Sequence, residues 1–192
     1  MASPLRLLVL GDSIAYGTGA LRADDTLGRR LSAALTADGF DVDLHVLAVP
    51  GAVSADLAVV VIGANDLARF LPPEQAAASL AAAVGALRAR GTDVVVVPAP
   101  DMSSVPFVPP AFRPLVQAAC AQLQRRQTEV AEAAGATVAD IGAEVGRAFV
   151  ADPAMFSGDR FHPSSAGYGR IAAALAPTVV EAARARRDEA AA

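Results

Sequence analysis

The sequence predicts an α/β domain built on a mainly parallel β-sheet. Short apolar runs rich in valine and leucine recur along the 192 residues, and segments with helical periodicity separate them. This alternation favours parallel strands, because a parallel connection must return to the start of the next strand and usually does so through a helix. No internal repeat or linker interrupts the pattern. We therefore expect one domain over residues 1–192, large enough to bury roughly 70% of its unfolded surface.

The first expected strand is the apolar run Leu5–Leu10, which ends in Gly11-Asp12-Ser13. Its length is typical of a strand buried on both faces and is too short to cross a membrane. Ser13 therefore follows the carboxyl end of a strand, where open α/β sheets bind their ligands. Asp12 is expected to order this turn through backbone hydrogen bonds.

The following elements are read from caps, stops and apolar patterns. Asp24, Asp25 and Thr26 offer an N-cap to the next helix, and Gly39 ends it. A strand over 42–49 stops at Pro50-Gly51. The expected elements in chain order are strands at 5–10, 42–49, 57–62, 94–97 and 137–141, and helices at 27–38, 74–90, 115–134, 143–149 and from 163 onward.

The connection between the second and third strands is abnormally short. About eight residues, 49–56, remain for it, whereas a parallel crossover normally needs a dozen or more. Two arrangements fit this length. Either the crossover is a short extended one, or the two strands are not both parallel neighbours.

Two later segments are expected to be irregular. Residues 101–114 contain four prolines and cannot form regular structure throughout, so they are predicted to form a loop over the carboxyl edge of the sheet, as a substrate lip. The tail from about 184 to 192 is charged and alanine-rich, and we expect it to fray. Aromatic residues that either line an acyl pocket or belong to the core are Tyr16, Phe107, Phe112 and Phe161.

The bulk composition excludes several function classes. A net charge of −4 without a basic stripe argues against a nucleic-acid partner, and no apolar run reaches the length of a membrane span. Cys120 is the only cysteine, which rules out an intrachain disulfide and fits a reducing compartment; we expect it to be an inert core residue. No signal-peptide pattern is recognised, so a cytoplasmic location is expected. One cysteine and two histidines disfavour a metal site, and no cofactor is implied.

Polar residues at the strand ends predict nucleophilic catalysis. Serine is a weak nucleophile at neutral pH and needs an adjacent base, which His162 can provide for Ser13. The base must be oriented and its transient positive charge stabilised, and Asp159 lies three residues before it. Because the carboxyl ends of parallel strands meet at one edge of the sheet, these residues can come together despite their separation in sequence.

A tetrahedral intermediate needs hydrogen-bond donors for its negative oxygen. Candidate donors are the backbone N–H groups of Ser13 and Gly51 and the side-chain amide of Asn65. Gly51 suits this role because a glycine lets the backbone approach the reacting atom closely. The sequence thus predicts an oxyanion hole of three groups beside the nucleophile.

In these residues the chain resembles the SGNH, or GDSL-like, lipase/esterase family. The four motifs of that family occur in order: Gly11-Asp12-Ser13, the lone Gly51, Gly63-Ala64-Asn65-Asp66, and Asp159 to His162. The resemblance covers nearly the whole chain. It implies a flavodoxin-like three-layer α/β/α sandwich with a five-stranded sheet, and a serine esterase or lipase that acts on small ester substrates.

The chain departs from the family at the second crossover. Members usually carry a helix between the glycine motif and the Gly-x-Asn-Asp motif, but here only 14 positions separate Gly51 from Asn65. Two alternatives to an esterase stay open. One is a binding protein of the same fold that has lost activity through the short crossover. The other is a flavodoxin-type nucleotide or flavin module that uses Ser13–Gly19 as a phosphate cradle.

Overall fold

The computed structural model describes residues 4–47 and 55–191, and its centre is a five-stranded sheet in which all neighbouring strands are parallel. The strand order is β2-β1-β3-β4-β5, and helices cover both faces, which confirms the predicted three-layer α/β/α fold. The strands are β1 (Leu5–Gly11), β2 (Val42–Leu47), β3 (Leu57–Val61), β4 (Asp93–Val97) and β5 (Thr137–Val138).

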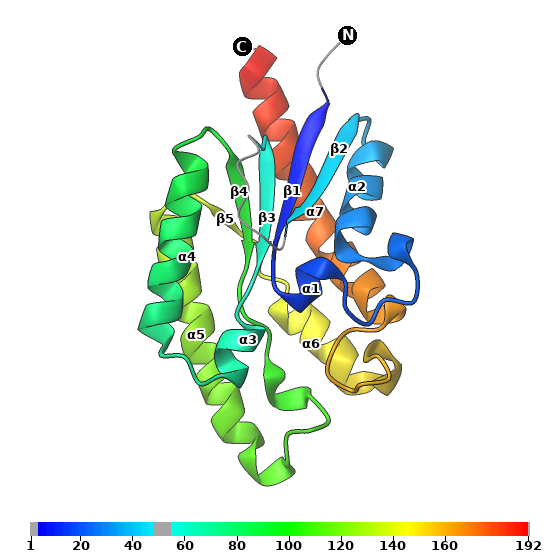
Figure 1. Ribbon diagram of the computed structural model, residues 1–192, viewed down its shortest axis with the longest axis vertical. Coiled ribbons are helices and arrows are strands. Elements are labelled where there is room, and N and C mark those ends of the chain that lie inside the picture. Colours follow the sequence, from blue (N-terminus) through cyan, green and yellow to red (C-terminus); the bar gives the residue numbers. More distant parts are fainter. Residues whose placement is uncertain (1–3, 48–54, 192) are drawn as a thin grey trace.

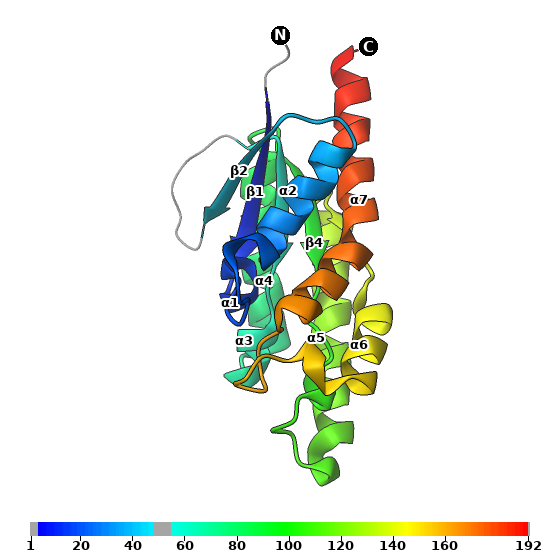
Figure 2. The same cartoon turned by 90° about the vertical axis from the view of Figure 1, so that its right-hand side faces the viewer.

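Helices of two pairs form the outer layers. On one face α2 packs against α7, and on the other α4 packs against α5 (Figures 1 and 2). Within the described residues, no helix combines the length and apolarity needed to cross a membrane. The α-helices are α1 (Ser13–Tyr16), α2 (Leu27–Ala37), α3 (Ala64–Ala68), α4 (Pro73–Arg88), α5 (Arg113–Ala133), α6 (Gly142–Ala151) and α7 (Ser165–Ala191), and single turns of 3₁₀ helix span Ala23–Asp25, Met102–Ser104, Pro110–Phe112 and Pro153–Met155.

The core has two halves because successive residues of a strand point to opposite faces of the sheet. Leu7 and Val9 of β1 join the cluster under α2 and α7, whereas Leu8 joins the cluster under α4 and α5. All five residues of β3 are buried, as expected for a central strand covered on both faces. The apolar run that begins the chain therefore supplies both halves of the core.

The structure shows how the second and third strands are arranged in the sheet. β2 and β3 are both parallel to β1 and lie on either side of it, so they are not neighbours of each other. Only nine residues separate them in sequence. Gly51 lies within this connection and outside the described residues.

Several element boundaries differ from the sequence-based expectations. β5 has two residues rather than five, because the chain leaves the sheet after Val138 and turns into α6. The expected capping of α2 is also wrong in detail: Thr26 occupies the N-cap position, but its hydroxyl donates to the carbonyl of Ala23 instead of accepting from the helix. The proline-rich segment is irregular as predicted, apart from its two short 3₁₀ turns and its last two residues, Arg113 and Pro114, which begin α5.

The expected frayed tail is instead helical as far as Ala191. Arginines hold it against the rest of the fold: Arg184 pairs with Asp38 after α2, and Arg186 pairs with Asp93 at the start of β4. The guanidinium of Arg187 lies 4.9 Å from the ring centre of Phe40. These contacts explain why a charged, alanine-rich sequence stays ordered here.

Asp56, at the start of β3, fixes this strand beside β1. Its carboxylate accepts hydrogen bonds from the backbone N–H of Arg6 at 2.9 Å and from the Arg6 guanidinium at 3.0 Å. Burial acts to raise the pKa of Asp56, but the hydrogen bonds and charge of Arg6 outweigh it and hold the pKa below its usual range. The folded state therefore favours the ionised carboxylate.

We expect Asp56→Ala to lower the free energy of unfolding by about 1–3 kcal/mol at pH 7, because it removes charged hydrogen bonds from a half-buried site. A lowered folded pKa stabilises the fold above the unfolded pKa of about 3.9, and this contribution is lost as pH falls through the folded pKa. Urea denaturation of both proteins at pH 7 and in steps below pH 4 should show the difference shrinking in acid. Asp188→Ala is the control, since that carboxylate is 78% exposed; a difference that persists in acid would contradict the assignment.

Candidate active site

Ser13 lies at the carboxyl end of β1 as the first residue of α1. Asp12 caps this short helix, as expected, since its Oδ1 accepts a hydrogen bond from the backbone N–H of Ile14 at 3.1 Å. The carbonyl of Ser13 accepts from the N–H groups of Gly17 and Thr18, which closes the glycine-rich turn. The serine hydroxyl is therefore presented from a turn with fixed geometry.

A short closed loop presents His162. Phe156 and Pro163 form an antiparallel bridge, and the N–H of Ser157 donates to the carbonyl of His162 at 2.7 Å. Inside this loop, Oδ1 of Asp159 accepts from the N–H groups of Phe161 and His162, each at 2.9 Å, and from the Ser157 hydroxyl at 2.7 Å. One carboxylate oxygen thus holds the loop, and the other is left for the imidazole.

The structure brings Ser13, His162 and Asp159 into one hydrogen-bonded chain. Nδ1 of His162 lies 2.6 Å from Oδ2 of Asp159, and Nε2 lies 3.0 Å from Oγ of Ser13. Because an ionised carboxylate can only accept, Nδ1 carries the proton, and Nε2 of the neutral ring is left as an acceptor for the serine hydroxyl. This arrangement can remove a proton from the serine.

Hydrogen bonds keep Asp159 ionised. The hydrogen bond from the His162 side chain has the largest effect and lowers the pKa of Asp159. Burial opposes it, but the further hydrogen bonds from the Ser157 hydroxyl and from two backbone N–H groups help to hold this pKa well below its usual range. The folded state therefore favours the ionised carboxylate of Asp159. Ser157, which the sequence reasoning missed, contributes to this through its 2.7 Å bond.

Asn65 approaches the same site from the neighbouring strand. It lies in α3, directly after β3, and β1 and β3 pair side by side at the point where the strand order reverses. Its Nδ2 donates to Oδ2 of Asp12 at 3.2 Å, which links the two strand ends. Burial, and then the nearby charge of Asp12, raise the pKa of Asp66. Gly51, the remaining predicted donor, is not among the described residues.

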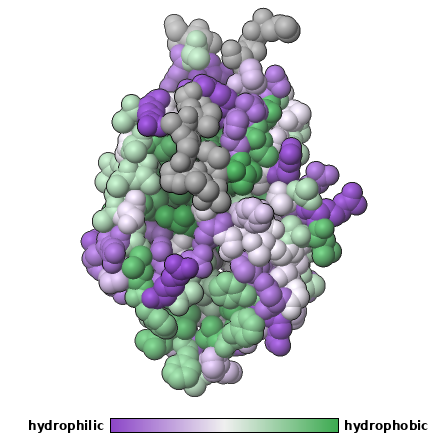
Figure 3. Space-filling view, in the orientation of Figure 1, coloured by the Kyte–Doolittle hydropathy of each residue, from purple (hydrophilic) through white to green (hydrophobic). Residues whose placement is uncertain are grey.

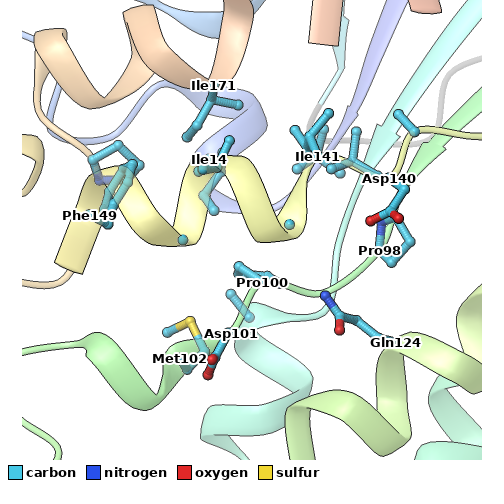
Figure 4. A pocket seen from close by; sticks show the side chains of 18 of the residues that line it. Ile14, Pro98, Pro100, Asp101, Met102, Gln124, Asp140, Ile141, Phe149 and Ile171 are labelled. Carbon is cyan, nitrogen blue, oxygen red and sulfur yellow. The ribbon is translucent and has the colours of Figure 1, made fainter. Parts of the chain in front are cut away.

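A cavity of about 570 Å³ adjoins Ser13 and His162 (Figure 4). Residues of the proline-rich segment line it, including Asp101, Met102 and Val105, in agreement with the expected lip. Phe161 is the one of the four aromatic candidates that lies among the lining residues; Tyr16, Phe107 and Phe112 are more than half exposed. Figure 3 shows hydrophobic residues gathered at the lower end of the molecule, where Figure 1 places the segment between β4 and α5.

One wall of the cavity was not expected from the sequence. α6 contributes Gly142, Val145, Gly146 and Phe149, and the preceding Ile141 extends this row. The signal was present as apolar residues at every fourth position beside two glycines at the same spacing.

Cys120 is buried as expected, and burial raises the pKa of its thiol. In the part of the chain that is described, no group of three or more metal-ligating side chains is close enough to hold an ion.

At Gly19 the turn that follows Ser13 packs closely against the loop that carries His162, and this close packing can be tested by its effect on stability. Gly19 has φ +95°, and a Cβ there would lie 2.4 Å from the carbonyl oxygen of Pro163. Gly39 has φ +89° but open space around its Cβ position. Gly39→Ala should cost about 1–2 kcal/mol through backbone strain alone. Gly19→Ala should cost clearly more in urea denaturation, because the backbone must also move; equal losses would contradict this close packing.

Comparison with known proteins places this geometry in a family. Residues 9–170 match the model of the GDSL-like lipase/acylhydrolase family. The GDSL-like esterase Rv1075c of Mycobacterium tuberculosis is 33% identical over 186 residues, which cover 88% of this chain. The chain spans about 59% of the length of that relative.

Solved structures share the fold at lower identity. TesA superposes with a TM-score of 0.73 at 23% identity, covering 92% of this chain and 99% of TesA. Axe2, an acetylxylan esterase from Geobacillus stearothermophilus, superposes with a TM-score of 0.72 at 19% identity, covering 93% of this chain and 95% of Axe2. The matched family model spans most of the sequence, including Ser13, Asn65, Asp159 and His162. The chain belongs to the GDSL-like lipase/acylhydrolase family.

Proposed function

We propose that this protein is a serine esterase that hydrolyses small carboxylic esters through an acyl-enzyme on Ser13. The observation that carries the proposal is the hydrogen-bonded chain from Asp159 through His162 to Ser13, with distances of 2.6 and 3.0 Å. A nucleophile, its base and an orienting carboxylate are what ester hydrolysis at neutral pH requires. Rv1075c and Axe2 are both named as esterases, which supports the same reaction type.

The reaction follows from the positions of these groups. Oγ of Ser13 attacks the ester carbonyl carbon while Nε2 of His162 takes the hydroxyl proton. The imidazolium then protonates the leaving alcohol oxygen, so that the C–O bond breaks and the acyl group stays on Ser13. Water repeats the sequence: His162 accepts its proton, the hydroxyl attacks the acyl carbon, and the proton returns to Oγ as the acid leaves. Asp159 stabilises the positive ring in both steps.

We propose two donors for the carbonyl oxygen in this scheme, the backbone N–H of Ser13 and the side-chain amide of Asn65. As the first residue of α1, Ser13 has a backbone N–H with no acceptor inside its own helix. The amide of Asn65 has two hydrogens, and the bond to Asp12 uses one and orients the other. We propose the N–H of Gly51 as the third donor, on the basis of the family motif.

The glycine-rich turn is poorly suited to the alternative role of a phosphate cradle. A phosphate is held by several free backbone N–H groups. Here the N–H groups of Ile14, Tyr16, Gly17 and Thr18 all donate within the turn, to Asp12 or to Ser13. This supports the esterase over a flavin- or nucleotide-binding module.

The proposal is tested by active-site labelling. We expect a fluorophosphonate probe to modify the wild-type protein at Ser13, and Ser13→Ala to abolish both labelling and hydrolysis of 4-nitrophenyl acetate. His162→Ala should lower both rates by at least about 10³-fold, because the hydroxyl then lacks its base. Peptide mass spectrometry locates the adduct.

The matched control is His45→Ala. His45 also pairs with an aspartate, since its Nε2 lies 3.0 Å from Oδ2 of Asp43, but it belongs to β2 and is not among the residues that line the cavity. This variant should keep wild-type labelling and hydrolysis. A well-folded wild type that neither reacts with the probe nor hydrolyses the ester would overturn the proposal and favour the inactive binding protein.

Asn65→Ala tests the oxyanion assignment. Removing one donor from an oxyanion hole typically lowers kcat by about 10²–10³-fold, and we expect a loss of that size with little change in KM. Steady-state kinetics with 4-nitrophenyl acetate measure it. A loss confined to KM would assign Asn65 to substrate binding instead.

A further inference from the structure

The packing of α6 leaves an apolar space in the fold. The helix carries Val145 and Phe149 on the side that lines the cavity, and both are only partly buried against the core. An amphipathic helix normally buries its apolar stripe against other side chains. Here that stripe packs partly against the core and also borders a cavity of about 570 Å³, a volume within the range of small-molecule sites.

The walls of this cavity, which includes Ser13, are formed mainly by apolar side chains. In Figure 4, α6 crosses the view with Ile14 and Ile171 on one side and Pro100 and Met102 on the other. Polar side chains, among them Asp101, Gln124 and Asp140, interrupt these walls. Along the apolar parts of these walls a sugar would leave its hydroxyls without partners, which is costly, whereas an alkyl chain would gain contacts.

Two glycines keep the space open. Gly142 and Gly146 lie one turn apart on α6, and both line the cavity. A Cβ on Gly146 would meet no atom within 4 Å, and one on Gly142 would approach only the amide end of Gln124, at 3.1 Å. Glycine is unfavourable inside a helix, and neither position needs it for packing against protein.

We infer that this cavity binds the acyl chain of the substrate, as a linear alkyl chain of medium length, because its volume of about 570 Å³ exceeds what an acetyl group needs. The inference rests on the proposed esterase function and specifies its substrate class. Ile14 and Ala64 adjoin the two proposed oxyanion donors, Ser13 and Asn65, and both line the cavity. A carbonyl held by those donors therefore directs its acyl substituent under α6.

Chain-length kinetics test this directly. With 4-nitrophenyl esters from acetate to dodecanoate, kcat/KM should rise about fourfold per methylene until the cavity is filled, since that is the gain from burying one methylene. Gly146→Leu should lower the ratio of decanoate to acetate kcat/KM at least tenfold, and Gly146→Ala should lower it less. A wild-type profile that is flat or highest for acetate would overturn the inference.

Gly85→Leu is the matched control. Gly85 also lies inside a helix, α4, with no atom within 4 Å of its Cβ position, but it is exposed to solvent away from the cavity. It should keep the wild-type profile. Acetate esters of hexanol, octanol and decanol form a second series: a steep length dependence there, with none in the acyl series, would place the alcohol in the cavity and overturn the acyl assignment.

A binding measurement separates this inference from the proposed chemistry. Decanoate should raise the Tm of wild type and of Ser13→Ala in a concentration-dependent way, acetate should not, and Gly146→Leu should lose the effect. If Ser13→Ala kept full activity while decanoate still stabilised it, the serine mechanism would fail and the chain-binding cavity would stand. If the serine mechanism held but decanoate stabilised neither protein, the cavity inference alone would fail.

Discussion

The parallel pairing of β1 with β3 is the constraint on which the site depends. It sets the carboxyl ends of these strands side by side, so the turn carrying Ser13 and the turn carrying Asn65 lie next to each other. Strand order reverses at this point, and a crevice forms there in open α/β sheets. The loop that carries His162 reaches the same edge of the sheet just before α7 begins.

Most of the fold could be predicted because its signals are local. Leu5–Leu10 and Leu57–Val61 are apolar on both faces and bounded by glycine, and this pattern alone indicates central strands. The prediction of a frayed C-terminal tail is wrong because the contacts that order this tail are not local. Its order depends on Arg184 and Arg186 reaching partners about 146 and 93 positions away, which no local pattern reveals.

The candidate site also has parts that local sequence patterns reveal and a part that they do not. Ser13, Asn65, Asp159 and His162 could be selected because each stands at an element end with the chemistry that the reaction needs, and the structure brings these four together. The cavity could not be selected, since an empty volume depends on how far α6 stands from the sheet. The glycines at 142 and 146 were visible, but a missing side chain indicates space only when its surroundings are known.

The carboxylate of Asp12 joins the two halves of the site. One of its oxygens accepts from the Ser13 turn at Ile14, and the other accepts from Asn65. The turn that carries Ser13 and the side chain of Asn65 are therefore linked through one carboxylate, although they follow different strands. Changes on either side of Asp12 will not act independently, so the loss from altering both is not the sum of the separate losses. Asp12 thus links the two strand ends of the candidate site through its two carboxylate oxygens.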